Sequence, residues 1–81
     1  MSEDILVLVE TLSQIEQDDS VPRNVKLKLK NAMLALQGPD PDNKIKASRA
    51  LQELDDVSDD PNIPSYVRPQ IWNVVSMLEG F

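Results

Sequence analysis

The sequence predicts an all-α fold, an up-and-down bundle of four helices built from two tandem helical hairpins. Three observations carry this prediction: a repeat with a period of 42 residues, apolar residues at helical spacing, and prolines and glycines at matching places in both copies. Two hairpins can bury together the apolar stripes that neither could bury alone. Seven positions are identical in the two copies: Leu12 and Leu54, Asp18 and Asp60, Pro22 and Pro64, Val25 and Val67, Asn31 and Asn73, Leu36 and Leu78, and Gly38 and Gly80.

We expect a single domain over residues 1–81, with the first hairpin at residues 3–38, a linker at 39–43 and the second hairpin at 44–80. The linker contains two prolines and is the only clear break in the helical pattern. Short connections make successive helices antiparallel neighbours, so the simplest arrangement is a bundle with pseudo-two-fold symmetry.

The first helix of each hairpin is predicted at residues 3–17 and 43–58. Ser2 and Asp42 precede these helices and suit the N-cap position, where a side-chain oxygen accepts a hydrogen bond from a free backbone N–H. Apolar residues then recur at helical spacing. They are Ile5, Leu8, Val9, Leu12 and Ile15 in the first copy, and Ala47, Ala50, Leu51, Leu54 and Val57 in the second.

The second helix of each hairpin is predicted to begin at a proline, Pro22 or Pro64, because the first helical position has no need of a backbone N–H. Pro69 lies inside the last helix, so this helix either starts nearer Ser65 or bends in its first turn. The two stripes are Val25, Leu29, Ala32, Met33 and Leu36, and Val67, Ile71, Val74, Val75 and Leu78.

These second helices are predicted to end at Gly38 and Gly80. Glycine commonly closes a helix because it adopts a left-handed conformation without steric cost. Pro39 follows the first of them and prevents the helix from continuing.

An acidic turn precedes the second helix in each hairpin. Asp18 and Asp60 occupy equivalent positions, and we interpret them as caps or as charges that favour the positive ends of those helices. Clustered carboxylates are also ligands for divalent cations, which take six or more oxygens. A capping requirement recurs with the fold and no EF-hand spacing is present, so capping is the favoured interpretation and no metal site is predicted.

The formal net charge of −6 is unevenly distributed. The segment from Arg23 to Arg49 has seven basic and two acidic residues, a net charge of +5, and the rest of the chain carries −11. The overall balance argues against general nucleic-acid binding, which favours basic domains. The basic side chains either contact phosphates or form a solvated face paired with neighbouring acids, which we favour. The candidate anion contacts are Arg23, Lys26, Lys30, Lys44, Lys46 and Arg49.

Several large apolar residues lie off the predicted core stripes. Single exposed apolar residues are ordinary, but several on helices that already have a full stripe indicate an interaction surface. Trp72 is the only tryptophan, and it either anchors an interface or completes the core of a helix buried on two sides. The candidate interface residues are Leu6, Val7, Leu27, Leu34 and Trp72.

The residue content argues against an enzyme. The chain has no histidine and no cysteine, which removes the usual general base and the thiol nucleophile. Two glycines cannot form a glycine-rich phosphate loop. No cofactor and no small-molecule substrate are therefore predicted.

The beginning of the chain predicts a cytoplasmic protein. It is acidic where a secretory signal is basic, and its apolar run at residues 5–9 is too short to cross a bilayer. No membrane association is expected.

The turn segment DSVPRNVK, taken with Asp18 before it, and the segment DPNIPSYVRPQIW share an aspartate, a proline four residues later, and a valine followed by a basic residue. With this spacing the chain resembles a family of small archaeal helical proteins known only as an uncharacterised protein family (UPF). The resemblance covers residues 5–80 and implies a compact four-helix bundle, an archaeal cytoplasmic origin and no assigned activity. More distantly, each hairpin is similar to a HEAT repeat, which implies a scaffold or adaptor role.

The leading functional hypothesis is a protein–protein interaction module that is not an enzyme. It would form a homodimer or dock as a small subunit on a larger complex. The alternative is an RNA- or ribosome-associated factor that uses the basic face of the second and third helices.

Overall fold

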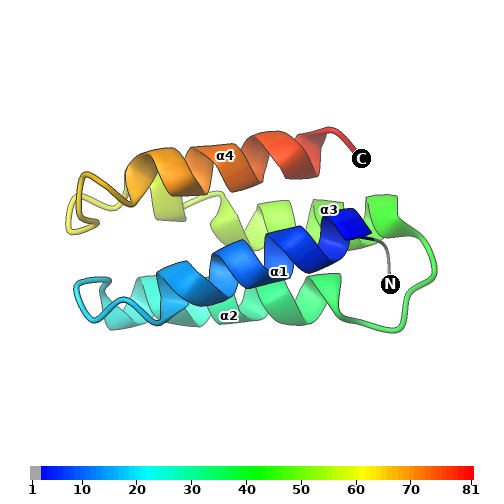
Figure 1. Ribbon diagram of the computed structural model, residues 1–81, viewed down its shortest axis with the longest axis horizontal. Coiled ribbons are helices and arrows are strands. Elements are labelled where there is room, and N and C mark those ends of the chain that lie inside the picture. Colours follow the sequence, from blue (N-terminus) through cyan, green and yellow to red (C-terminus); the bar gives the residue numbers. More distant parts are fainter. Residues whose placement is uncertain (1–2) are drawn as a thin grey trace.

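The computed structural model describes residues 3–81 and confirms the all-α prediction (Figure 1). Successive helices run antiparallel and pack into one bundle that extends 35 × 19 × 18 Å. Within the described residues there is no strand. The elements are α1 (Glu3–Glu16), α2 (Arg23–Leu36), α3 (Asn43–Leu54), the 3₁₀ turn η1 (Val57–Asp59) and α4 (Arg68–Glu79).

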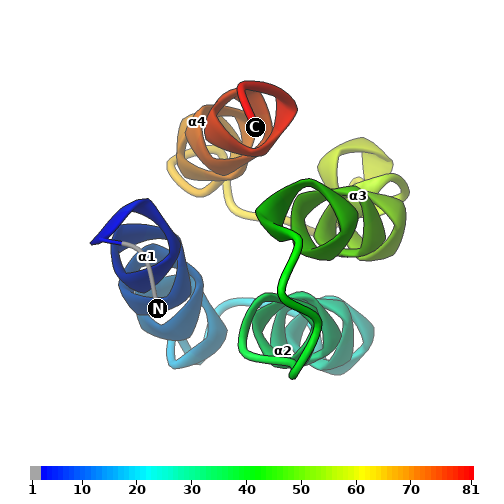
Figure 2. The same ribbon diagram turned by 90° about the vertical axis from the view of Figure 1, so that its right-hand side faces the viewer.

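The two copies of the 42-residue repeat are related by a pseudo-two-fold axis that runs along the bundle. Viewed down the long axis, α1, α2, α3 and α4 follow one another around the bundle, so that α1 lies diagonally opposite α3 and α2 opposite α4 (Figure 2). Rotation by half a turn about the bundle axis therefore places the first hairpin on the second. The face shared by α1 and α2 thus lies opposite the equivalent face shared by α3 and α4.

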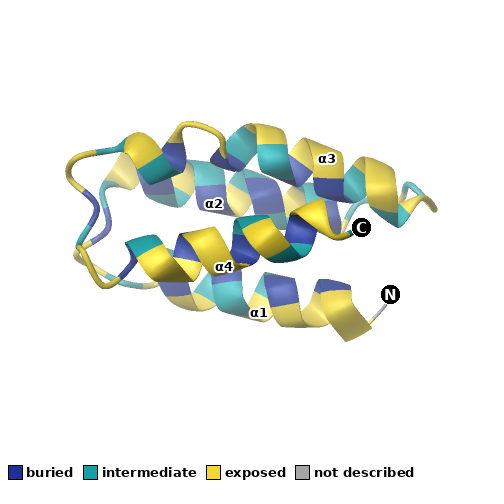
Figure 3. Ribbon diagram, turned by 90° about the horizontal axis from the view of Figure 1, so that it is seen from above, coloured by how far each residue is buried: buried dark blue, intermediate teal, exposed yellow. Residues whose placement is uncertain are grey.

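The core is built from equivalent positions of the two hairpins. Every buried residue of the described chain is apolar, and each buried residue in one hairpin has a buried counterpart 42 positions away in the other (Figure 3). This is expected because equivalent helices carry their apolar residues at equivalent positions, so that the same face of each helix points into the core. The nine pairs are Ile5 and Ala47, Leu8 and Ala50, Leu12 and Leu54, Ile15 and Val57, Val21 and Ile63, Val25 and Val67, Leu29 and Ile71, Ala32 and Val74, and Leu36 and Leu78.

The prolines do not begin helices as predicted. Pro22 is the N-cap of α2, with an extended ψ of 150°, and its carbonyl accepts the bond from Lys26 N–H at 2.9 Å. Pro64 lies in a turn, and α4 begins only at Arg68, later than the start near Ser65 that we considered. The reason is Pro69, whose ring would clash with the carbonyl four residues earlier in a longer helix. In the observed helix Pro69 lies in the first turn, where no N–H is needed.

The helix ends also differ from the prediction. Neither glycine is left-handed, and Gly80 has φ −79°. Both helices close by a tighter 3₁₀-type turn, with Gly38 N–H bonded to Ala35 and Gly80 N–H to Met77. Such i→i−3 bonds satisfy the last carbonyls without a left-handed residue.

For α3, the first helix of the second hairpin, the predicted start is confirmed and the predicted end is wrong. The Asp42 cap is confirmed, because its side chain accepts from Lys44 N–H at 2.9 Å. The helix stops at Leu54 rather than at residue 58, and η1 continues the chain. Acidic residues Asp55 and Asp56 follow this C-terminus, where the helix dipole disfavours negative charge. The Ser2 cap lies outside the described residues.

Candidate functional site

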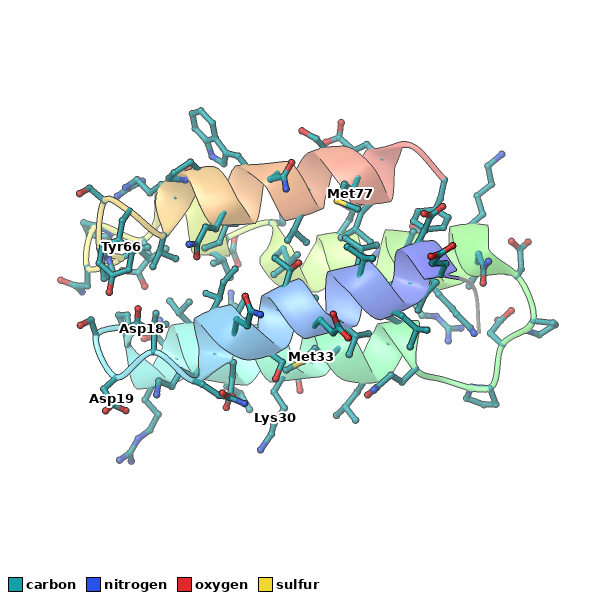
Figure 4. All side chains as sticks on the ribbon, viewed as in Figure 1. Asp18, Asp19, Lys30, Met33, Tyr66 and Met77 are labelled. Atoms are coloured by element: carbon teal, nitrogen blue, oxygen red, sulfur yellow. The ribbon has the colours of Figure 1, made fainter. Side chains whose placement is uncertain are left out.

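The two hairpin turns are joined to each other by a reciprocal pair of side-chain hydrogen bonds. The Tyr66 hydroxyl donates to Oδ2 of Asp18 at 2.6 Å, and the Asn24 amide donates to Oδ2 of Asp60 at 3.1 Å. Donors and acceptors are each 42 residues apart, so the pseudo-two-fold axis relates the two bonds. We call these four residues the turn clasp; Figure 4 shows Asp18 and Tyr66 at the end of the bundle where both turns lie.

The second carboxylate oxygen of each clasp aspartate organises its own turn. Oδ1 of Asp18 accepts from Ser20 N–H, and Oδ1 of Asp60 accepts from Asn62 N–H, both at 2.8 Å. These bonds stabilise the turn locally. Neither α2 nor α4 has a side-chain capping bond, so the predicted capping hydrogen bonds are wrong. Over residues 3–81 no three carboxylates are placed to hold a metal ion.

The clasp shifts the ionisation of its own members. The hydrogen bond from Tyr66 is the largest cause that holds the pKa of Asp18 below its ordinary value of 3.8, and the bond from Ser20 N–H adds to it. The same bond to Asp18 raises the pKa of Tyr66 above 10.0. The folded state therefore favours the ionised aspartate together with the neutral tyrosine.

We expect Tyr66→Phe to destabilise the protein in a pH-dependent way. The lowered pKa of Asp18 contributes stability above pH 3.8 that is lost as the pH falls through the folded-state value. The raised pKa of Tyr66 contributes stability below pH 10.0 that is lost as the pH rises through the folded-state value. The difference in unfolding free energy between wild type and Tyr66→Phe should therefore be largest between these limits and should shrink at both ends, as urea titrations across pH would measure.

The equivalent substitution Asn24→Ala serves as the control. It removes the matching bond to Asp60, but the amide does not titrate, so its effect should not shrink at alkaline pH. A Tyr66→Phe difference that stays constant across the whole pH range would contradict the role of this hydrogen bond.

The structure separates the beginnings of the two predicted basic groups. Arg23 and Lys26 lie in the first half of α2, near the hairpin turns, and Lys44 and Lys46 in the first half of α3, near the connection between α2 and α3 (Figure 1). Because the two helices are antiparallel, these pairs lie toward opposite ends of the bundle, whereas Lys30 and Arg49 lie near the middle of their helices and Arg49 lines a groove together with Asn31, the residue after Lys30. The first group is Arg23, Lys26 and Lys30, and the second is Lys44, Lys46 and Arg49.

Two lysines of α2 have acidic partners within the chain. Nζ of Lys26 lies 3.9 Å from Asp19, and Nζ of Lys28 lies 3.0 Å from Asp56. Lys28 was not among the predicted anion contacts, although it lies between two of them in sequence. Pairing with neighbouring acids, which the sequence favoured, applies to these side chains.

All five candidate interface residues are exposed. Trp72 is 65% exposed, which excludes the alternative that it completes the core. Ile45 and Tyr66 are also exposed large apolar residues, and the same off-stripe position would have identified Ile45 in the sequence. The exposed fractions of the others are 49% for Leu6, 44% for Val7, 58% for Leu27 and 61% for Leu34.

Leu6 and Leu27 lie on one face of the bundle and Trp72 on the opposite face, whereas Val7 belongs to neither. Residues three or four apart are neighbours on a helix surface, so Leu6 lies beside half-buried Val9, and Lys30 lies beside half-buried Met33. Figure 4 shows Met33 between α1 and α2, and Lys30 pointing outward from α2. We define the α1/α2 face by its outward side chains and its half-buried seam. It consists of Glu3, Leu6, Val9, Glu10, Arg23, Leu27, Lys30 and Met33, with Leu34 at its edge, where Leu34 also lines a groove between α2 and α3.

The equivalent α3/α4 face contains a shallow groove. Leu51 and Val75, the counterparts of Val9 and Met33, both line it. Trp72 lies three residues before Val75 and so stands beside the groove on the surface of α4. The complete lining is Leu51, Leu54, Asp55, Ser58, Val75 and Glu79, with two carboxylates at its edge.

The α3/α4 turn is fastened by Arg68. Its two terminal nitrogens donate to the carbonyl oxygens of Ser58 at 2.8 Å and Asp60 at 3.1 Å. The planar guanidinium reaches both acceptors at once, which a lysine in that position could not do. The equivalent residue of the first hairpin is Lys26.

Fold and surface together define the class of protein: a small duplicated helical bundle whose unusual features are exposed apolar side chains on two opposite faces. No helix in the described part of the chain is long and apolar enough to span a membrane. The chain belongs to the uncharacterised protein family UPF0147, whose sequence pattern matches residues 1–81. This confirms the family resemblance inferred from the turn segments.

Similar proteins come from archaea. A UPF0147 protein of Methanothermobacter thermautotrophicus is 40% identical over 71 residues, which cover 88% of this chain and 70% of that protein. A UPF0147 protein of Metallosphaera sedula is 44% identical over 68 residues, covering 84% of this chain and 76% of that protein. The crystal structure of unknown function protein MMP1188 is similar with a TM-score of 0.91 and 37% identity, covering 98% of this chain and 90% of that one.

Proposed function

We propose that this protein is a cytoplasmic protein–protein interaction module without enzymatic activity, a small subunit or adaptor. One observation carries the proposal: Trp72 is 65% exposed beside a groove, on a helix whose core positions are already filled. The nine buried pairs leave no core position for the indole. An exposed tryptophan next to an apolar depression is typical of an interface anchor.

The chemistry around Trp72 supports a protein partner. Leu51, Leu54 and Val75 give the neighbouring groove an apolar lining, and Asp55 and Glu79 add charge to it. Apolar centres with polar rims are the usual anatomy of protein interfaces. Burying one tryptophan removes about 150–250 Å² from water, and anchors of this kind contribute about 2 kcal/mol or more.

The basic residues support the RNA-binding alternative less well. Arg23 and Lys26 lie toward one end of the bundle and Lys44 and Lys46 toward the other, and Lys26 has an acidic neighbour in Asp19. No exposed aromatic side chain other than Tyr66 and Trp72 occurs in the described residues, and Trp72 lies on the face opposite the α1/α2 face. Stacking of bases between lysines therefore has little support.

The test is capture of partners from extract of an archaeon that carries a UPF0147 protein. Immobilised wild type should retain specific proteins that survive nuclease treatment, and Trp72→Ala should reduce their retention at least about tenfold, as expected for loss of 2 kcal/mol. Gln14→Ala, on the exposed surface of α1, is the control and should retain them fully.

A second measurement uses the single tryptophan of the chain. Its fluorescence should shift to shorter wavelength when the purified retained protein is added, because the indole leaves water. Retention that Trp72→Ala does not change, retention that nuclease removes, or no retention at all would each overturn the proposal.

A further inference from the structure

We propose that the α1/α2 face binds a second copy of this chain, with α1 of each protomer lying against α2 of its partner. This inference rests on the proposed function and names one partner for the interaction module. It concerns the face opposite Trp72, which stays accessible in the dimer.

The charges of the α1/α2 face form two columns of opposite sign. Glu3 and Glu10 are seven residues apart on the outer surface of α1, and Arg23 and Lys30 are seven apart on the outer surface of α2. Residues at this spacing lie in line along a helix. Across residues 3–81, the ion pairs involve other side chains, Lys26 with Asp19 and Lys28 with Asp56. The two columns are therefore available to a partner.

Exposed leucines lie within the same two columns. Leu6 lies between Glu3 and Glu10, and Leu34, which also lines the groove between α2 and α3, follows Lys30 by one helical turn at the edge of the face. These leucines are 49% and 61% exposed. The face thus combines exposed apolar side chains with charged ones. Exposed apolar side chains that lie together indicate an interaction site rather than a surface that only contacts water.

Only one symmetric arrangement pairs these columns favourably. A two-fold axis perpendicular to the helices would place α1 against α1, and acidic residues would meet acidic residues. A two-fold axis parallel to the helices places α1 against the partner's α2, so Glu10 meets a basic residue, Lys30, whereas Glu3 and Arg23 lie at opposite ends of the bundle and do not pair. Two-fold interfaces require this kind of self-complementary surface.

The register within that arrangement brings matching residues to the same level. For the proposed register we place Val9 and Met33, the counterparts of the groove residues Leu51 and Val75, at about the same level on α1 and α2. Counting along the antiparallel helices from this level, Glu10 lies about 3 Å along the axis from the level of Lys30, and Leu6 about 3 Å from that of Leu34. In the dimer, Glu10 therefore faces the partner's Lys30, and Leu6 lies near the level of the partner's Leu34 at the edge of the interface.

The size of the face sets the strength of the dimer. A long side of a bundle that extends 35 × 19 × 18 Å has an area of the order of 600 Å². Standard interfaces bury about 800 Å² on each partner, and smaller ones are transient. We therefore expect a reversible dimer with a dissociation constant on the order of micromolar.

Sedimentation velocity at low salt, over a range of protein concentrations, tests the proposal. Wild type should show reversible dimerisation, and Lys30→Glu and Glu10→Lys should each weaken it at least about tenfold. An equimolar mixture of the two variants should restore the dimer, because both charge contacts are then opposite in sign in the mixed dimer. Lys44→Glu, with the same charge change on α3, is the control and should dimerise like wild type.

The outcomes separate this inference from the proposed function. A wild type that stays monomeric at the highest soluble concentration, or a mixture that fails to restore the dimer, overturns the inference. Retention of other proteins through Trp72 would then still support the interaction module. Conversely, a dimer that the mixture restores, together with no retention through Trp72, supports the inference and overturns the role of the α3/α4 face.

Discussion

Leu12→Ala and Leu54→Ala should each lower the free energy of unfolding by about 2–5 kcal/mol, the usual cost of removing a buried leucine side chain. Leu12 is 0% exposed and Leu54 1% exposed, and they occupy equivalent positions of the two hairpins. A domain of this size has a total stability of about 4–12 kcal/mol, so either substitution removes a large part of it. Urea denaturation followed by helical circular dichroism measures the loss.

The pseudo-two-fold symmetry supplies a stringent comparison for this prediction. Because the two leucines are equivalent, their losses should be similar. Leu34→Ala removes the same atoms from a side chain that is 61% exposed, and it should change stability by less than about 0.5 kcal/mol. A loss below about 1 kcal/mol for both buried leucines would contradict the described core.

Arg68→Met should destabilise the protein by about 2–3 kcal/mol, although no core residue changes. Arg68 donates to the carbonyl oxygens of Ser58 and Asp60, and hydrogen bonds to charged groups contribute about 1.5–3 kcal/mol each. Methionine keeps the aliphatic length but leaves both carbonyls without this donor. Thermal and urea unfolding of the variant measure the loss.

Two further variants separate the geometry from the charge. Arg68→Lys keeps the charge but cannot bond both carbonyls in the same fork, so it should recover only part of the loss. Lys26→Met, at the equivalent position of the first hairpin, should cost at most about 1 kcal/mol, because it removes only an ion pair of 3.9 Å at the surface. Equal losses for Arg68→Met and Lys26→Met would contradict the assigned role of the arginine.

The sequence predicted the core well because the repeat tests each position twice. When the same position is apolar in both hairpins, as at Leu36 and Leu78 or at Val25 and Val67, burial is indicated more strongly than by one hairpin alone. The helix starts were harder to predict. Pro64 matches Pro22 in the alignment, yet Pro69, which has no counterpart in the first hairpin, delays the start of α4 to Arg68.

The turn clasp could not be predicted because it joins residues far apart in the chain. Asp18 and Tyr66 are 48 residues apart, and no periodicity of either segment reports on the other. The matching hydrogen bond joins Asn24 and Asp60, which are 36 residues apart in sequence. Local propensity correctly placed the aspartates in turns but assigned their oxygens to helix caps, whereas the tertiary fold uses them between the turns.

The exposed apolar residues were predictable individually, but their grouping was not. Position off the stripe identified Leu6 and Leu34 as exposed, and it left Trp72 open between an interface and the core. Which of them share a face depends on the order of the helices around the bundle and on the rotation of each helix about its own axis. Val9 and Met33, both half-buried, lie at the seam beside Leu6 and Lys30, whereas their counterparts Leu51 and Val75 lie on the opposite face beside Trp72.

The pseudo-two-fold axis has a consequence for how the chain is connected. The beginning of α1 and the end of α4 lie at the same end of the bundle as the connection between α2 and α3 (Figure 1). A circular permutant, opened within residues 37–42 and joined between α4 and α1, would keep the direction of every helix and all nine buried pairs. The order of the two hairpins along the chain is thus a property of the connection, and the packing itself does not distinguish a first hairpin from a second.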